Sequence, residues 1–345
     1  MVYIIILKKR KGCVIISRQK RERGYFMSEK RKVLLIVNPC AGKNKTRAGT
    51  FDIVDRFSSE DYDFTVKTTT GPGDATDIVL KNIDGHDMVV CCGGDGTLYE
   101  TINGIMQLPT RVPVGYIPAG STNDLASTIG LPMGDFRAAT DIIIDGNTNG
   151  YDIGLFNNKF FTYVASFGFG ISLSYGTSQK MKNKLGHAAY VIDGAILKLP
   201  QLIKEIKPIH MKIEYDGGVI EDDFYFGAIS NATTVAGTFK YDKNDVRLDD
   251  GVFEVLLIRR VNGPLDVLKL LGKVRKGDFD GDQILYFKTT RARMIFDNPE
   301  KWTLDGEYGG EHKDVRFSVI NKAVDICSPD GNPLFIGDKK EYTEV

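Results

Sequence analysis

The sequence lacks several features that mark the commoner classes of binding and membrane protein. Its 45 lysines and arginines balance 45 aspartates and glutamates, so there is no basic excess of the kind that a nucleic-acid-binding protein carries. No apolar run reaches the roughly 18 to 20 residues that a membrane-spanning helix requires. What is present, 42% hydrophobic and 26% charged residues in 345, is typical of a globular protein long enough for two domains.

Cysteine and histidine are also scarce. The five cysteines are an odd number and lack the paired spacing of a metal site. Cys91 and Cys92 stand in an apolar run, where buried and reduced thiols are expected. This pattern favours a cytoplasmic protein. His187 and His210 have no cysteine or paired carboxylate near them in the sequence, so we expect structural roles for both.

The first 27 residues are interpreted as an extension that the fold does not need. The apolar run Val2–Leu7 precedes the basic stretch Lys8–Lys11, which is the reverse of the order in a secretory signal. Met27 directly precedes the expected domain start, so a start codon assigned too far upstream would explain the extension. A basic arm that binds a membrane surface is the alternative.

Strand and helix signals alternate in the first half of the chain. Val33–Val37 is a continuous β-rich apolar run, typical of a parallel strand buried on both faces. Repeated units of this kind predict a parallel α/β sheet with right-handed crossovers. The expected strands are 33–37, 63–68, 87–92 and 114–117, and the expected helices are 46–57, 74–81, 98–106 and 123–129.

Beyond about residue 148 many short strands favour an antiparallel sandwich or barrel. The boundary falls in the turn-forming cluster Asp145–Gly150. The expected strands are 150–156, 159–166, 209–215, 223–230, 253–259, 283–288, 293–296, 315–320 and 323–327, with helices near 185–199 and 265–276. The predicted division is an extension over 1–27, an α/β domain over 28–147, a β-sandwich domain over 148–325, and a segment over 326–345 whose return to the first domain is left open.

Three glycine-containing turns follow strand-like runs in the first half, and they are Asn38–Lys43, Gly93–Thr97 and Pro118–Asp124. In an open parallel sheet such turns meet at the carboxyl edge, where ligands bind. Glycine lets backbone N–H groups approach a phosphate, and the following helix directs its positive end toward it. The set predicts a nucleotide-phosphate site. The sequence contains neither a P-loop motif nor a G-x-G-x-x-G opening the first helix, which disfavours dinucleotide dehydrogenases.

Together with Leu248–Val255 and Trp302–Glu307, these turns resemble the motifs of the diacylglycerol kinase family, which includes bacterial lipid kinases and, more distantly, sphingosine and ceramide kinases. The resemblance runs from about Lys32 to Asp325. It implies an α/β nucleotide domain, a C-terminal β-sandwich domain and an active site in the cleft between them. It further implies ATP- and Mg²⁺-dependent phosphorylation of a lipid hydroxyl, such as that of diacylglycerol, by a cytoplasmic enzyme peripherally associated with the membrane.

The resemblance also implies which residues bind the nucleotide. Ser121 stands where the family usually has threonine and keeps the hydroxyl, whereas Tyr99 replaces the more usual asparagine. Thr69, four residues before Gly73, resembles the family's ATP-contacting threonine. The implied contacts are Asn38, Pro39, Cys40, Ala41, Gly42, Thr69, Gly94, Asp95, Gly96, Thr97, Leu98, Tyr99, Glu100 and Ser121.

Glu307 matches the family's catalytic base, which takes the proton of the acceptor hydroxyl. A turn glycine beside it would let the carboxylate project into a cleft, although Asp305–Gly306 is also a common pair in ordinary surface hairpins. Asp95 is implied as a catalytic residue that contacts, directly or through water, the Mg²⁺ bound with ATP.

A second, structural Mg²⁺ is implied in the C-terminal half. Its contacts map to the carboxylate of Asp250 and to the backbone carbonyls of Arg247 and Val252. A solvated turn is the alternative interpretation of Asp249–Gly251.

Two other functions stay open. NAD kinases share the Gly-Gly-Asp-Gly-Thr loop, although Gly120–Asp124 and Asp305–Glu307 favour the lipid branch. A nucleotide-binding regulator without catalysis is opposed by the presence of all the expected acidic groups. The sequence does not identify the lipid, does not decide whether the chain forms a homodimer, and does not show how it reaches the membrane.

Overall fold

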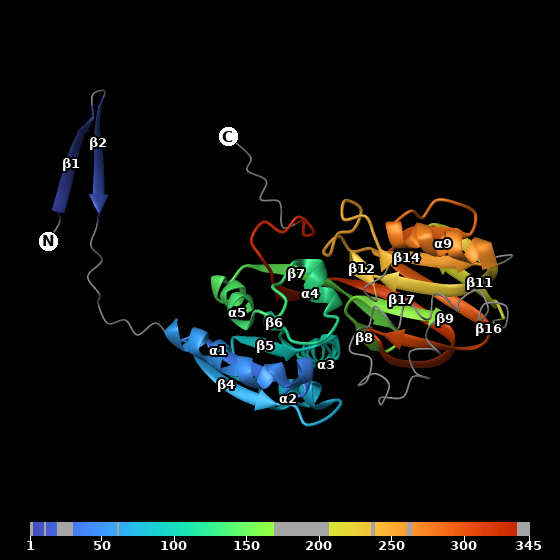
Figure 1. Ribbon diagram of the computed structural model, residues 1–345, viewed down its shortest axis with the longest axis horizontal. Helices are drawn as coiled ribbons and strands as arrows, with labels where there is room; N and C mark the ends of the chain where they lie inside the picture. The colour runs from blue at the N-terminus through green and yellow to red at the C-terminus, as the bar shows by residue number, and fades with distance from the viewer. Residues whose placement is uncertain are drawn as a thin grey trace.

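A computed structural model describes residues 3–9, 12–18, 30–60, 62–168, 207–235, 239–260 and 264–336. The helix expected near 185–199, and His187 within it, lie outside these residues. Most of the described strands join one 13-stranded sheet that continues through both halves of the chain (Figure 1). The strands β1 (Tyr3–Lys9) and β2 (Gly12–Arg18) form a separate antiparallel pair.

The first half is a parallel sheet in the order β4-β3-β5-β6. β3, β5 and β6 are buried almost throughout, which explains their continuous apolar sequences. The strands are β3 (Lys32–Val37), β4 (Asp63–Thr68), β5 (Met88–Gly93) and β6 (Val114–Pro118). The helices are η1 (Ala41–Asn44), α1 (Lys45–Ser59), α2 (Asp74–Asn82), α3 (Asp95–Met106), α4 (Asp124–Ile129) and α5 (Phe136–Asp145).

Helices cover both faces of the parallel sheet. Alternate residues of β3 and β5 pack on one side against α1 and α5 and on the other against α2, α3 and α4. Cys91 and Cys92 point to opposite sides, and both are buried and free. The expected α/β pattern is therefore confirmed for this half.

The helix α5 was not expected from the sequence. The carboxylate of Asp135 caps it by accepting a hydrogen bond from Ala138 N at 2.9 Å. Gly146, with φ 74°, ends it. Ala139 and Ile143 bury its apolar face against the sheet. The expected helix over 98–106 also begins earlier, at Asp95, directly after the Gly93–Gly94 turn.

The strands of the second half pair antiparallel with one another. β10 and β9 both lie between β11 and β16, pairing with different parts of these two strands. The elements are β7 (Thr148–Phe156), β8 (Lys159–Phe161), β9 (Val164–Gly168), β10 (Ile209–Tyr215), β11 (Gly218–Ser230), β12 (Thr234–Val235), β13 (Phe239–Lys240), β14 (Phe253–Arg259), α9 (Pro264–Lys276), β15 (Ile284–Thr289), β16 (Arg291–Leu304) and β17 (Glu307–Cys327).

Three sequence predictions need correction in this half. The single strand expected over 159–166 is divided into β8 and β9. The short strand expected over 293–296 is part of β16, which continues to Leu304. The two strands expected over 315–320 and 323–327 are one strand, β17, because its pairing with β7 continues past a register shift between Ile320 and Val324.

The strand β17 links the two halves. It pairs antiparallel with β16 and β7 and then, at Ile326, parallel with Val114 of β6. The parallel sheet and the antiparallel strands are therefore continuous across β6, β17 and β16.

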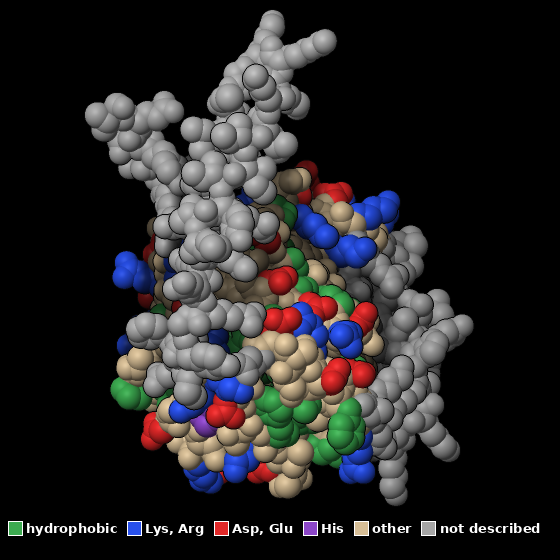
Figure 2. All heavy atoms as spheres, turned by 90° about the vertical axis from the view of Figure 1, so that its left-hand side faces the viewer, with side chains coloured by type: hydrophobic (Ala, Val, Ile, Leu, Met, Phe, Trp, Pro, Cys, Tyr) green, Lys and Arg blue, Asp and Glu red, His purple; other side chains and the backbone are tan. Residues whose placement is uncertain are grey.

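The surface carries both signs of charge. On the face in Figure 2, basic and acidic side chains of the described residues alternate without a large patch of one sign. The His210 ring lies between Asp223 (Nδ1 to Oδ1, 2.9 Å) and Glu221 on the surface of β10 and β11, and its structural role stays a prediction. No helix within the described ranges is long and apolar enough to cross a membrane.

Candidate active site

The three glycine-containing turns lie side by side at the carboxyl edge of the parallel sheet. They follow β3, β5 and β6, which are adjacent strands. Asn38 N donates to Cys92 O at 2.9 Å, and Ala119 N donates to Gly93 O at 2.7 Å. Thr69, at the end of β4, joins the same edge because its N–H donates to Val37 O at 3.0 Å.

Two of the turns touch backbone to backbone. A Cβ atom placed on Gly120 would lie 2.6 Å from Gly94 Cα, a distance that real side chains do not reach. Glycine is therefore required at this contact for a steric reason. The third turn is held by Asn123, whose Oδ1 accepts from Gly120 N at 2.9 Å and from Tyr116 OH at 3.1 Å.

Asn38 ties the first turn to the start of α3. Its Nδ2 donates to Thr97 Oγ1 at 3.0 Å, and its Oδ1 accepts from Cys40 N at 3.0 Å. The rest of this turn, Pro39 to Gly42, is partly or fully exposed, with Gly42 at φ 56°. The exposed backbone of this turn can therefore meet a ligand.

Asp95 opens α3 and faces the start of α4. Burial raises the pKa of its carboxyl, while backbone N–H groups of Asp124, Asn123 and Leu125 act in the opposite direction. Its Oδ1 atom is enclosed and accepts no hydrogen bond from the residues that the structure describes. An enclosed carboxylate oxygen without a donor suits a cation, so this position fits the Mg²⁺ that accompanies a nucleotide.

Glu307 lies beside the second turn although it is far away in sequence. It directly follows the two-residue loop Asp305–Gly306, in which both residues have positive φ, 51° and 84°. This is the twist that suits a tight hairpin. A Cβ atom placed on Gly96 would lie 3.3 Å from Glu307 Oε1. The structure thus brings the expected base to the glycine turn, with its side chain exposed.

The hairpin loop is not an ordinary surface turn, because Asp305 is buried. Its carboxylate accepts hydrogen bonds from Thr162 N at 2.6 Å, Thr162 Oγ1 at 2.7 Å, Tyr163 N at 2.9 Å and Val164 N at 2.9 Å. These bonds use the backbone N–H groups that would otherwise continue a strand, which explains why β8 and β9 are separate. Sequence reasoning gave Asp305 no role of its own, and the only signal was its place in the Asp-Gly-Glu triplet.

The remaining residues of the second turn have different surroundings. Leu98 and Thr97 are buried, so the Leu98 side chain belongs to the core. The carboxylate of Glu100 accepts from Gly73 N at 2.7 Å and Ala75 N at 3.1 Å, and so caps the start of α2. Ser121 is exposed at the third turn. Direct contacts of these residues with a nucleotide stay predictions.

Tyr99 points away from the first half. Its side chain is partly buried against the core of the antiparallel half. Burial raises its pKa to about 12, with further contributions from the negative charges of Asp305, Glu307 and Glu100. Asn103, one turn later on α3, donates to the carbonyls of Tyr99 at 2.9 Å and Phe160 at 3.5 Å. The helix that carries the glycine turn is therefore docked onto β8.

The residues expected to bind a second Mg²⁺ belong to a separate turn in the second half. Asp250 is partly buried, burial raises its pKa, and its Oδ1 accepts from Val252 N at 3.1 Å. Asp152 supports the same turn by accepting from Gly251 N at 2.6 Å. Among the described residues no group of three or more histidine, cysteine, aspartate or glutamate side chains could hold a metal. A cation near Asp250 would therefore depend on backbone carbonyls, such as that of Arg247, and on water.

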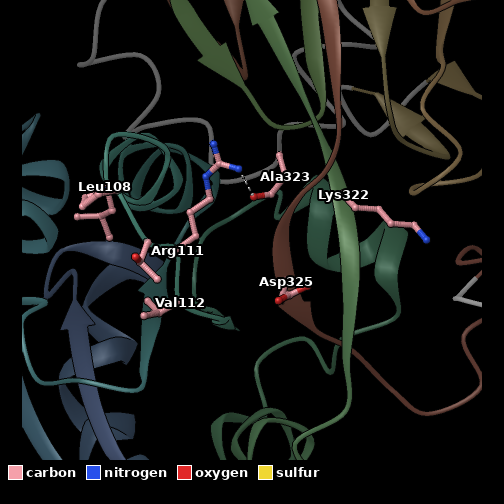
Figure 3. A pocket seen from close by; sticks show the side chains of 8 residues that line it. Leu108, Arg111, Val112, Lys322, Ala323 and Asp325 are labelled. Carbon is pink, nitrogen blue, oxygen red and sulfur yellow. Dashed lines mark hydrogen bonds between the residues drawn. The ribbon is translucent and has the colours of Figure 1, made fainter.

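A cavity of about 530 Å³ lies away from the three turns (Figure 3). It adjoins Val112, before the amino end of β6, whereas the turns are at the carboxyl ends. The Arg111 guanidinium crosses it to donate to Ala323 O at 3.1 Å. The lining residues are Leu108, Pro109, Thr110, Arg111, Val112, Lys322, Ala323 and Asp325.

Comparison with known proteins agrees with this geometry. Residues 32–156 match the diacylglycerol kinase catalytic domain. A diacylglycerol kinase of Staphylococcus haemolyticus is 30% identical over 303 residues, which cover 86% of this chain and 87% of that protein. A diacylglycerol kinase of Bacillus subtilis is 29% identical over 282 residues, covering 81% and 91%.

The fold is shared with a solved structure. A crystal structure of a diacylglycerol kinase from Bacillus anthracis superposes with a TM-score of 0.69 at 21% identity, covering 88% of this chain and 99% of that one. With the long match to the staphylococcal protein, the chain belongs to the diacylglycerol kinase family, and so to the phosphotransferases that use an alcohol group as acceptor.

Proposed function

We propose that this protein transfers the γ-phosphoryl group of ATP to the free hydroxyl of a membrane lipid, diacylglycerol in the first instance, with Mg²⁺ as the metal. The observation that carries the proposal is the contact between Gly96 and Glu307. It places a carboxylate beside a glycine turn at the positive end of a helix, where a phosphate and an acceptor hydroxyl can meet. The relatives from Staphylococcus haemolyticus and Bacillus subtilis are both named for diacylglycerol.

The residues of this chain divide the chemistry between them. Backbone N–H groups of the three turns, together with the start of α3, hold the phosphates of ATP. Asp95 directs its free oxygen to the cation, which neutralises phosphate charge when bound. Glu307 takes the proton of the acceptor hydroxyl. As the acceptor oxygen bonds to the γ-phosphorus, the bond to the β,γ-bridging oxygen breaks and its electrons leave with ADP.

The proposal also assigns the two halves of the chain. Residues 28–147 hold the nucleotide, and residues 148–325 hold the lipid while the protein is peripherally associated with the membrane surface. Glu307 comes from the second half and meets the turns of the first, so a site formed between the halves brings both substrates together.

The test is an assay with labelled ATP, Mg²⁺ and dispersed diacylglycerol, with NAD in a parallel reaction. We expect label in phosphatidate. We expect Glu307→Gln to lower kcat by roughly 10²- to 10⁴-fold and to leave the Kd for ATP within a factor of two to three. Glu311→Gln, an exposed position on the same strand, is the matched control. Label in NAD but not in lipid, or full turnover by the Glu307→Gln enzyme, would contradict the proposal.

A further inference from the structure

Asp305 is bound more tightly than its position in a hairpin loop requires. It is 3% exposed, and its two carboxylate oxygens accept four hydrogen bonds from Thr162, Tyr163 and Val164. Its own N–H donates to Val164 O at 2.8 Å. We call this set of bonds the Asp305 clamp.

The clamp requires a charged acceptor. All four partners are N–H or O–H donors, and an ionised carboxylate offers about four lone-pair sites. A protonated carboxyl group would turn one of these sites into a donor. The three backbone N–H groups cannot accept its proton, and only the Thr162 hydroxyl could, by reversing the direction of its own bond. Protonation of Asp305 therefore breaks or reverses at least one of the four bonds in a buried place.

The clamp fixes the position of Glu307. The loop between Leu304 and Glu307 has only two residues, so any movement of Asp305 is passed directly to Glu307. Leu304 pairs with Ala165 of β9 on one side, and Glu307 Oε1 faces Gly96 on the other. Displacement of a catalytic group by about 1 Å can cost on the order of 100-fold in rate.

We infer that Asp305 is the positioning residue of the catalytic carboxylate, and that Glu307 meets the glycine turn only while Asp305 is ionised and the clamp is closed. The inference deepens the proposed function and rests on it. Asp305 itself touches neither substrate nor the reacting atoms in this scheme.

The other titratable groups around Asp305 are Tyr99 on α3, Tyr151 on β7, Tyr163 between β8 and β9, and Glu307. Burial raises the pKa of Tyr99 to about 12 and the pKa values of Tyr151 and Tyr163 well above the ordinary value of tyrosine, so all three tyrosines stay neutral. Burial raises the pKa of Asp305 to about 6, against the effect of its four donors. The clamp is therefore closed at neutral pH and opens as the pH falls through about 6.

The kinetic test compares pH profiles of kcat for the full-length protein and variants. Thr162→Val removes one hydrogen-bond donor to Asp305. The ionised carboxylate is then less stable and its pKa rises, so the acid limb of the profile, where kcat falls with falling pH, should move to higher pH by roughly half a unit or more. Asp305→Asn should lower kcat by about 100-fold with little change in the KM for ATP. Thr140→Val, which also deletes a buried hydroxyl (Oγ1 to Phe136 O, 2.7 Å) but lies in α5, should leave the limb in place. An unmoved limb in Thr162→Val, or wild-type kcat in Asp305→Asn, would overturn the inference.

A second measurement needs no activity. Hydrogen exchange of the Thr162, Tyr163 and Val164 amides can be measured in the wild-type protein without substrates. Their protection factors should be lower at pH 5 than at pH 7. Equal protection at both pH values would refute the clamp, whatever the enzyme phosphorylates. Lost protection at pH 5 in a protein that phosphorylates no lipid would instead support the clamp and refute the proposed function alone.

Discussion

Lys288 on β15 lies opposite Glu254 on β14, with its Nζ atom 3.6 Å from Glu254 Oε1. Glu254 is completely buried, yet neither of its carboxylate oxygens accepts a hydrogen bond within the described part of the chain. Lys288 is held instead by Asp245, with its Nζ 3.1 Å from Asp245 Oδ1. Burial raises the pKa of Glu254 to about 8, and the nearby ammonium group only partly offsets this.

The stability of the protein should therefore depend on the charge of Glu254. The ordinary pKa of 4.5 applies to the unfolded chain and a value of about 8 to the folded one. Between these values the folded state keeps a proton that the unfolded state releases, so the free energy of unfolding should fall as the pH rises from 4.5 to 8. Urea unfolding of Glu254→Gln should show a smaller fall in the free energy of unfolding between these pH values. The difference from the wild-type protein should be on the order of a few kcal/mol across the range. The exposed substitution Glu311→Gln should keep the wild-type slope, and parallel curves for all three proteins would argue against the assignment.

Substitution of Gly96 by alanine should separate stability from turnover. A Cβ atom at this position would lie 3.3 Å from Glu307 Oε1, so the carboxylate must move. Alanine is favoured over glycine in a helix by about 1 kcal/mol, and we expect unchanged or higher thermal stability with kcat about 10- to 100-fold lower. Gly272→Ala in α9, where the added Cβ meets open space, should leave kcat at the wild-type value. Full turnover by Gly96→Ala would show that Glu307 tolerates displacement.

Asn38 should matter for nucleotide affinity. Asn38→Ala removes the bond to Thr97 Oγ1 and the acceptor of Cys40 N, which together keep the first turn in place. We expect the free energy of ATP binding to weaken by about 1 to 2 kcal/mol. This corresponds to a roughly 10-fold higher Kd for ATP, which calorimetry can measure. Asn149→Ala deletes a comparable bond, to Ser328 Oγ at 2.7 Å, outside the three turns. It should bind ATP as the wild type does, and equal affinities for all three proteins would count against a phosphate site at this edge.

The second predicted cation can be tested without nucleotide. If Asp250 and the carbonyls beside it bind Mg²⁺, millimolar Mg²⁺ should raise the midpoint of thermal unfolding of the wild-type protein by a few degrees. Asp250→Asn should abolish this rise, whereas Asp95→Asn should keep it because the ion proposed at Asp95 binds together with ATP. A rise that survives Asp250→Asn would place the cation elsewhere.

The first half of the fold could be predicted because its signals are local. Val33–Val37 is buried on both faces as its apolar run indicated, and the three glycine turns follow strands that were correctly located. Adjacent parallel strands end at one edge, so the meeting of Gly94 and Gly120 follows from topology alone. The helix α5 was missed, although Asp135 and Gly146 are ordinary capping residues.

The second half was less predictable because its decisive contacts are not local. The Asp305 clamp joins residues 141 to 143 positions apart, and no pattern within Thr162–Val164 indicates that its N–H groups bond to a side chain. The same holds for Glu254. In the sequence it is one polar residue within a mostly apolar strand, and its burial depends on neighbours that are distant in the chain. The approach of Glu307 to Gly96 came from the resemblance to a family, since spacing in the chain carries no such information.

The place of β17 in the sheet affects how the protein is made. Because Ile326 supplies the neighbour of Val114 in β6, the β6 edge of the parallel layer stays unpaired until the chain around residue 326 has been synthesised. The first half therefore completes its sheet only after the antiparallel strands of the second half have been made. A recombinant fragment ending near residue 147 would keep the edge of β6 unpaired. It should therefore self-associate rather than fold into a monomer that binds ATP.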